Sequence, residues 1–205
     1  LNISFEDSEY KRILTDADLI LPDGIGLQIA CKKLGLELKE NLNGTDFFPQ
    51  LLYFINQYNY SIYLLGATTP ILENLRKYIN NNFPNINIKG HHHGHLSDEE
   101  NINVCKEINQ KNPTITLVAM GVPTQEKWIK QNSDNINSSV IFAVGGLFDF
   151  YGGKNKRAPI WMREFGLEWM FRIYQEPGRM WKRYIIGNPK FLIRVNNEYN
   201  KQKFS

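Results

Sequence analysis

Two glycine pairs and a basic loop follow an apolar run at residues 140–144. The first pair, Gly145 and Gly146, ends this run, and the cations of residues 154–157 follow the second pair. Because glycine has no Cβ, the backbone N–H groups of such a loop can approach a ligand closely. The nearby cations favour an anionic ligand. A buried strand with an ordinary turn and a solvated basic loop would give the same pattern, so both interpretations stay open.

A carboxylate at the end of another apolar segment is the second candidate. Asp23 follows residues 18–22 and precedes the glycine-rich residues 24–26. A carboxylate at a strand end can act as a general base at the mouth of a site. Aspartate is also a favoured N-cap of a helix that starts at this point. Position alone does not separate the two roles of Asp23.

Two further patterns that include acidic residues suggest dinucleotide binding and metal binding, but the neighbouring sequence disfavours both. Residues 24–29 imitate the dinucleotide-binding fingerprint, and Asp46 lies where its ribose-binding acid would belong. Ile29 stands where that fingerprint needs a third glycine, so nicotinamide binding is not favoured. Asp16 and Asp18 match a paired-carboxylate metal pattern but precede a predicted strand, so a capping or solvated role is favoured.

Two polar segments precede predicted helices. All four histidines lie in residues 91–95, which we expect in a strand-to-helix loop. They have no acid or cysteine at ligand spacing, so a polar pocket edge or a simple loop is favoured over zinc. Residues 121–128 open a helix whose N–H groups favour anions. Gln125 and Glu126 there can hydrogen-bond a base or a sugar, although capping by Thr124 and a surface ion pair of Glu126 would also explain them.

Alternating strands and helices must position these residues. The strand patterns are apolar without alternation, which is typical of strands buried on both faces of a parallel sheet covered by helices. The predicted fold class is therefore α/β. Ligands of such sheets lie beyond the carboxyl ends of the strands. The predicted strands are 18–21, 61–65, 86–89, 114–120 and 140–144, and the predicted helices are 6–15, 25–34, 45–57, 70 onward, 97–110 and 125–131. Thr45 or Asp46 is expected to cap the third of these helices and Thr69 the fourth, and Ser97 with Glu100 is expected to form a capping box on the fifth.

The chain of 205 residues suits one domain with a small appendage. Cys31 and Cys105 form no disulfide framework or metal motif, which indicates a reducing compartment. No apolar run approaches ~18 residues, so no membrane span or signal peptide is predicted. The net charge of +3 combines −5 over residues 1–153 with +8 over residues 154–205. A basic tail on an acidic body indicates an anionic surface or ligand.

Aromatic residues alternate with Lys and Arg throughout residues 160–204. This combination suits a membrane interface or a nucleic acid. The segment could also be an amphipathic helical pair that packs on the rest of the chain with its polar face in water. Such a pair would be compatible with a membrane interface. Peripheral contact with a membrane is the favoured interpretation.

Six segments together resemble the WecG/TagA/CpsF glycosyltransferases, in order and spacing over nearly the whole chain. The segments are 21–26 (LPDGIG), 44–46 (GTD), 121–128 (GVPTQEKW), 145–150 (GGLFDF), 153–159 (GKNKRAP) and 166–179 (GLEWMFRIYQEPGR). The resemblance implies a Rossmann-like, mostly parallel sheet with a helical C-terminal appendage that binds membranes. It also implies inverting, metal-independent transfer without a cofactor.

The implied reaction moves a hexose or N-acetylhexosamine, with N-acetylmannosamine favoured, from a UDP-sugar to a polyprenyl-diphosphate-linked sugar. The context would be bacterial surface polysaccharide or teichoic acid synthesis at the inner face of the plasma membrane. The implied partners are donor, acceptor and membrane, with no nucleic acid, and the oligomeric state, including a homo-oligomer, stays open. A nucleotide-binding oxidoreductase and a basic nucleic-acid-binding module are the alternative functions.

The resemblance also assigns roles to residues. Asp23 would take the proton of the acceptor hydroxyl, and Gln125 and Glu126 would hold the nucleotide or sugar. The Gly145 and Gly146 amides would stabilise the leaving UDP. The cations expected to assist them are Arg172, Arg179 and Lys182 or Arg183, with Arg157 a weaker candidate. Further substrate contacts are expected from Gly24, Thr45, Asp46 and Asp149.

Two departures from the family pattern are visible. The family begins with a strand carrying a Thr-x-Asn motif, and the distance from Asn2 to Asp23 is too short for it, so we expect the first strand to be missing. Lys182 stands where the family usually has arginine, which keeps the charge but loses the bidentate fork. The expected domains are a catalytic domain at residues 1–159 and an appendage at residues 160–205.

Overall fold

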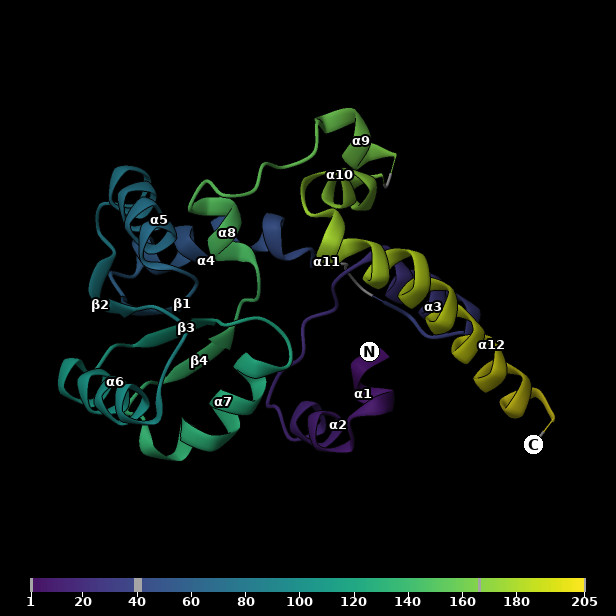
Figure 1. Cartoon of the computed structure of the whole chain (residues 1–205), viewed down its shortest axis with the longest axis horizontal. Coiled ribbons are helices and arrows are strands. Elements are labelled where there is room, and N and C mark those ends of the chain that lie inside the picture. Colours follow the sequence, from purple (N-terminus) through teal and green to yellow (C-terminus); the bar gives the residue numbers. More distant parts are fainter. Residues whose placement is uncertain (1, 39–41, 166, 205) are drawn as a thin grey trace. The chain divides into compact units, whose positions relative to one another are not determined.

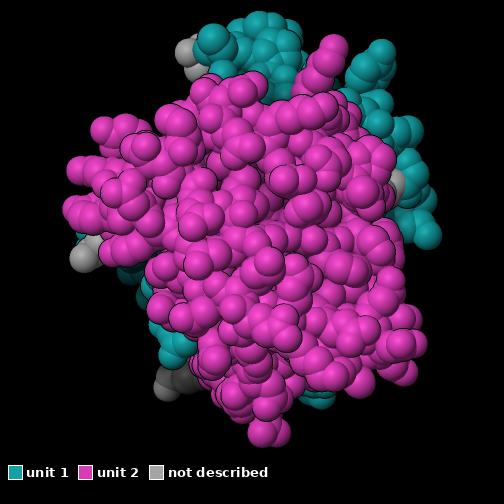
Figure 2. All heavy atoms as spheres, turned by 90° about the vertical axis from the view of Figure 1, so that its left-hand side faces the viewer, with its two compact units in different colours: residues 1–11, 17–43, 157–205 teal, residues 12–16, 44–156 magenta. Residues whose placement is uncertain are grey.

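The computed structural model describes residues 2–38, 42–165 and 167–204, without the side chains of Glu164, Arg179, Gln202 and Phe204. The chain forms two compact units, coloured separately in Figure 2. Unit 1 comprises residues 1–11, 17–43 and 157–205, and unit 2 comprises residues 12–16 and 44–156. The predicted domain division at residue 159 stays a prediction.

Unit 2 is built on a four-stranded parallel sheet (Figure 1). Its strands are β1 (Ser61–Gly66), β2 (Asn87–His92), β3 (Ile115–Ala119) and β4 (Val140–Ala143), in the order β2-β1-β3-β4. All five residues of β3 and the last five of β1 are buried. These central strands are covered on both faces, which explains their mostly apolar sequences. The predicted α/β class is confirmed.

Helices cover both faces of the sheet (Figure 1). One apolar cluster joins it to α4 (Gly44–Gln57), α5 (Thr69–Asn82) and α8 (Leu147–Tyr151). A second cluster joins the opposite face to α6 (Asp98–Lys111) and α7 (Thr124–Asn132), followed by a 3₁₀ turn, Ser133–Asn135. Alternate residues of β1 contribute to the two clusters, because successive side chains of a strand point to opposite faces.

Unit 1 is helical in its described residues. It contains α1 (Asn2–Glu6), the start of α2 (Ser8–Thr15), α3 (Ile25–Lys33), α9 (Ile160–Glu164), α10 (Glu168–Gln175), α11 (Pro177–Trp181), a π-helical segment (Lys182–Gly187) and α12 (Asn188–Phe204). Figure 1 shows α12 alongside α3. The Lys33 Nζ donates to Asn196 Oδ1 at 2.6 Å, and the Phe191 ring lies over Gly26. Arg194 bonds Asn2 and pairs with Glu6, which ties α12 to α1.

The predicted strand at residues 18–21 is wrong. This segment has no strand structure, and the side chains of Leu19 and Ile20 are 70% and 58% exposed. The segment belongs to unit 1, where the described elements are helices, so its backbone has no neighbouring strand with which to pair. An apolar run predicts a buried strand only if a sheet edge is available for it.

Smaller corrections concern helix starts. The cap of α5 is Thr68 rather than Thr69, and α7 begins at Thr124 with Pro123 as its cap. Helix α4 begins at Gly44, so Thr45 and Asp46 lie in its first turn instead of capping it. The capping box of α6 is confirmed, since Ser97 and Glu100 exchange both of its hydrogen bonds.

Candidate functional site

The candidate residues fall into two clusters, one in each unit. In unit 2 the parallel strands all end at one edge of the sheet, which is where ligands of such sheets bind. The turn after β1 lies so close to β3 that a Cβ on Gly66 would collide with the backbone of Ala119. The backbone of this turn therefore needs glycine at position 66.

The loop after β4 is joined to α7 through Gln125. Gly145 has a φ of 57°, in the left-handed region that favours glycine. Its N–H donates to Gln125 Oε1 at 3.0 Å, and Gln125 Nε2 donates to Glu126 Oε1 at 2.9 Å. Gln125 is only 3% exposed. The structure thus brings Gly145 together with Gln125 and Glu126, which the sequence placed on a different loop.

Glu126 has acceptor capacity that the described protein does not use. Burial raises the pKa of its carboxyl, and the hydrogen bond from Gln125 opposes this rise. Its Oε2 atom is buried and accepts no hydrogen bond from the described residues. A buried acceptor of this kind gains from a ligand that brings an O–H or N–H donor. A sugar hydroxyl or a base would supply one.

The other unit 2 candidates differ in accessibility. Gly146 is exposed, with open space where a Cβ would lie. Asp149 lies in α8 and pairs with Lys154, whose Nζ is 3.5 Å from Oδ2. Thr45 is 1% exposed, and its carbonyl accepts the Tyr151 hydroxyl at 2.6 Å. Asp46 is exposed in the first turn of α4.

In unit 1, Asp23 lies just before α3 but does not cap it. The N-cap is Gly24, which has a φ of 101° and no side-chain capping bond. Desolvation raises the pKa of the Asp23 carboxyl; Arg172 and Arg183 lower it, and Glu168 raises it again. The residue keeps an exposed surface, so this desolvation is weaker than that of a fully buried carboxylate.

Glu168 was not among the predicted site residues. It lies one helical turn before Arg172 in α10, and its Oε2 accepts from Asn43 Nδ2 at 3.4 Å. The i,i+4 spacing of Glu168 and Arg172 was visible in the sequence and could have indicated it. The result is a group of two carboxylates, Asp23 and Glu168, and two guanidinium groups, those of Arg172 and Arg183.

The remaining cations are placed less specifically. Lys182 and Arg183 open the π-helical segment, with their charges 5.9 Å from the rings of Trp181 and Tyr184, respectively. Arg157 is half-buried in the loop before α9. Arg179 lies in α11, and its side chain is outside the described part of the chain.

These clusters suit group transfer better than the dinucleotide alternative. A dinucleotide fingerprint needs a strand immediately before its glycines, and residues 17–24 form none. A carboxyl with a raised pKa can accept a proton, and the adjacent guanidinium groups can stabilise a leaving anion.

Comparisons with known proteins agree with this chemistry. The chain matches the glycosyl transferase WecG/TagA/CpsF family over residues 2–205. It is 35% identical over 202 residues to an N-acetylglucosaminyldiphosphoundecaprenol N-acetyl-beta-D-mannosaminyltransferase of Bacillus subtilis strain 168, covering 98% of this chain and 77% of that protein. A Staphylococcus aureus strain MW2 protein of the same name is 31% identical, with 99% and 78% covered. The chain therefore belongs to the WecG/TagA/CpsF family of glycosyltransferases.

Proposed function

We propose that this glycosyltransferase moves N-acetylmannosamine from UDP-N-acetylmannosamine to N-acetylglucosaminyl-diphosphoundecaprenol. The names of its relatives support this donor sugar and this acceptor. The observation that carries the assignment of roles is the position of Asp23 among Arg172, Arg183 and Glu168. This group combines a proton acceptor with cations for a diphosphate.

Asp23 is the general base of the proposed mechanism. Its carboxylate takes the proton of the acceptor hydroxyl as the hydroxyl oxygen attacks the anomeric carbon from the face opposite to UDP. A carboxyl with a raised pKa holds that proton better than an ordinary aspartate. The raised pKa therefore supports Asp23 as a base, provided that it stays ionised at the working pH.

The cations of unit 1 act on the leaving group. As the bond from sugar to UDP breaks, negative charge grows on the diphosphate, and Arg172 and Arg183 stabilise it. Arg179 and Lys182 are further candidates for this role, and Arg157 is a weaker one. The same cations lower the pKa of Asp23 and so keep it ionised.

The unit 2 cluster holds the donor. Glu126 accepts a hydroxyl or base N–H at its unused Oε2, and Gln125 orients Glu126. The Gly145 N–H already donates to Gln125, so Gly146 is the stronger candidate for a direct contact with the diphosphate. The substrate roles of Gly24, Thr45, Asp46 and Asp149 stay predictions.

Unit 1 also carries the proposed membrane contact at the inner face of the plasma membrane. Within the described residues, no helix is both long enough and apolar enough to cross a bilayer. Large apolar side chains are nevertheless exposed along α9–α12 beside Lys and Arg, as interfacial helices require. The exposed residues include Ile160, Trp161, Phe165, Met170, Tyr174, Trp181, Ile185 and Ile193.

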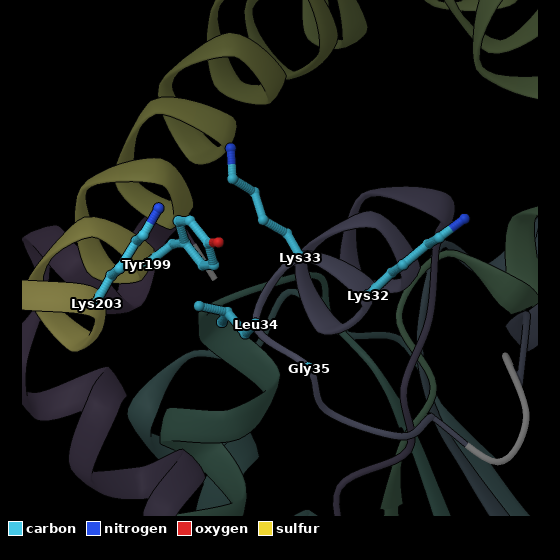
Figure 3. Close-up of a pocket in the computed structure, with 6 residues that line it drawn as sticks. All are labelled: Lys32, Lys33, Leu34, Gly35, Tyr199 and Lys203. Atoms are coloured by element: carbon cyan, nitrogen blue, oxygen red, sulfur yellow. The ribbon is translucent and has the colours of Figure 1, made fainter.

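A basic pocket in unit 1 supports the same role. Figure 3 shows Lys32, Lys33 and Lys203 around a pocket of about 400 Å³ with Tyr199. It lies at α3 and α12, and the Lys33 ammonium is 5.7 Å from the Tyr199 ring centre. Such cations would attract anionic lipid headgroups.

The decisive experiment measures transfer from UDP-N-acetylmannosamine, UDP-glucose and UDP-galactose to a synthetic polyprenyl-diphosphate-linked N-acetylglucosamine. We expect transfer of N-acetylmannosamine with release of UDP, and no comparable transfer of the other two sugars. Preferred transfer of glucose or galactose would overturn the proposed donor. Failure with every donor, using folded protein in lipid vesicles, would overturn the acceptor.

A further inference from the structure

Three potential metal ligands converge where β2 ends and α6 begins. His92, His93 and Glu100 each offer a ligand atom, and these atoms lie within 4.8 Å of one another. The sequence had indicated no acid at ligand spacing from the histidines. The histidines were also expected in a loop, whereas β2 extends through His92 and so fixes the position of the first ring. We propose that these three side chains bind a divalent transition-metal ion, with Zn²⁺ the best fit.

The protein already orients two of the three ligands. His92 Nδ1 lies 3.0 Å from the carbonyl of His93, so it donates there and leaves Nε2 as the ligand atom. Glu100 Oε2 accepts the Ser97 N–H at 2.8 Å within the capping box of α6. Its other oxygen, Oε1, faces His93 Nε2 at 3.7 Å. Hydrogen bonds of this kind fix ligand orientation in metal sites.

The His93 ring makes no close hydrogen bond to the described residues. Its Nδ1 atom is buried and has no hydrogen-bond partner among the described residues. Its other nitrogen, Nε2, makes only a long contact with Glu100. Coordination of a cation by Nε2 would replace that long contact with a metal bond.

The spacing and the donor set favour zinc. Tetrahedral zinc with bonds of about 2.0–2.2 Å places its ligand atoms about 3.3–3.6 Å apart. The contact between His93 and Glu100 is already close to this value, and the full set needs side-chain shifts of roughly 1 Å. Two imidazoles and one carboxylate are a zinc donor set that leaves a fourth position open.

The open position has space beside it. His93, His95, Thr68, Thr69 and Pro70 line a pocket of about 290 Å³ at the start of α5. Water or an anionic ligand could complete the coordination there. His95 is a further side chain within this pocket, although it is not part of the converging group.

The proposed metal site belongs to unit 2, whereas Asp23 belongs to unit 1. Its consequence would be structural, because one ion would tie the end of β2 to the first turn of α6. The proposal does not rest on the proposed transferase activity. Zinc binding and sugar transfer can each fail without the other.

The test is zinc binding by the full chain, with any affinity tag removed, measured by competition with a chromophoric chelator. The variants are His92→Gln, His93→Gln and Glu100→Gln, and the last keeps an acceptor for the capping box. His91→Gln is the matched control, because His91 is on the same strand but its Nε2 contacts Glu73 Oε1 at 3.2 Å. Visible absorption of bound Co²⁺ reports the geometry.

We expect saturable binding of one ion, a tetrahedral Co²⁺ spectrum and a zinc-dependent rise in Tm. Each ligand variant should weaken binding at least about 10- to 100-fold, the loss that even an outer-shell change causes. His91→Gln should bind like wild type. No saturable binding by wild type, ligand variants that bind as well as wild type while folded, or equal loss in His91→Gln would each overturn the site.

Discussion

Units 1 and 2 handle their apolar residues in opposite ways. Unit 2 buries them on both faces of its sheet, and Leu64, Leu117 and Phe148 are fully buried. Unit 1 leaves many large apolar side chains in contact with solvent, including Phe165 at 76% and Tyr174 at 83%. Unit 2 is therefore stabilised by its own apolar core, whereas the surface of unit 1 suits an external apolar partner.

The candidate site residues of the two units also differ in their chemistry. Unit 2 presents a neutral and acidic cluster, Gln125 and Glu126, that suits a sugar or base. Unit 1 presents Asp23 with guanidinium groups that suit proton transfer and a diphosphate. Donor recognition and reaction chemistry should therefore respond to different substitutions.

The largest effect is expected from unit 1. Asp23→Asn should lower kcat by about 10²- to 10⁴-fold, because it removes the proposed general base. Desolvation raises the pKa of Asp23. The fall of the wild-type kcat/KM at low pH should therefore begin at a higher pH than it would with an ordinary aspartate as the base. Steady-state kinetics across pH check both, with Asp18→Asn, an exposed aspartate of the same segment, as the control. Near wild-type turnover of folded Asp23→Asn would exclude the assigned base.

The second prediction compares one substitution in the two units. Leu64→Ala should lower the free energy of unfolding by about 2–5 kcal/mol, because it leaves a cavity in the core. Leu19→Ala should change it by less than about 0.5 kcal/mol, because Leu19 is exposed. Chemical denaturation measures both. A comparable loss at Leu19 would restore the buried strand that the sequence predicted.

Glu126→Gln sharpens the role of unit 2. The loss of a charged acceptor should raise KM for the donor about 10- to 100-fold with a smaller change in kcat. The wild-type carboxyl has a raised pKa in the folded state, so its stability contribution is complete below the ordinary glutamate pKa and declines as pH rises. Glu126→Gln should therefore have a higher Tm than wild type at neutral pH, and this difference should disappear in acid. A kcat loss with unchanged KM would contradict a donor-binding role.

The smallest effect concerns the membrane. Tyr174→Ser in unit 1 should weaken binding to anionic vesicles by about 1 kcal/mol, or about fivefold, through lost apolar contact. Tyr53→Ser, an exposed tyrosine of unit 2 on α4, should leave it unchanged. Vesicle sedimentation measures both. Equal losses from the two variants would mean that the membrane contact is not confined to unit 1.

The comparison also explains what the sequence could predict. The central strands were found because each is mostly apolar, and they are mostly apolar because both of their faces meet helices. The same pattern failed at residues 18–21, since composition does not tell whether a partner strand exists. Local signals such as Ser97 with Glu100 succeeded because the whole motif lies within one turn.

Residues brought together by folding were harder to find. Gln125 and Gly145 are distant in sequence and meet through one hydrogen bond of 3.0 Å. Glu100 meets His93 because a capping bond turns its carboxylate, and spacing alone does not show that orientation. Glu168 could have been found from its position before Arg172, but its effect on Asp23 depends on the fold of unit 1.

The path of the chain through the two units has a consequence for biosynthesis. Unit 2 has all of its residues once residue 156 has been made, whereas unit 1 begins with the earliest residues and needs residues 157–205 as well. Asp23 therefore leaves the ribosome well before Arg172 and Arg183, by on the order of ten seconds at ~5–20 residues per second. During that interval the sheet can fold, but the carboxylate lacks the cations that accompany it in the finished protein. With the roles proposed for Asp23 and the two arginines, catalytic competence would be acquired last, when the apolar helices that suit a membrane have also emerged.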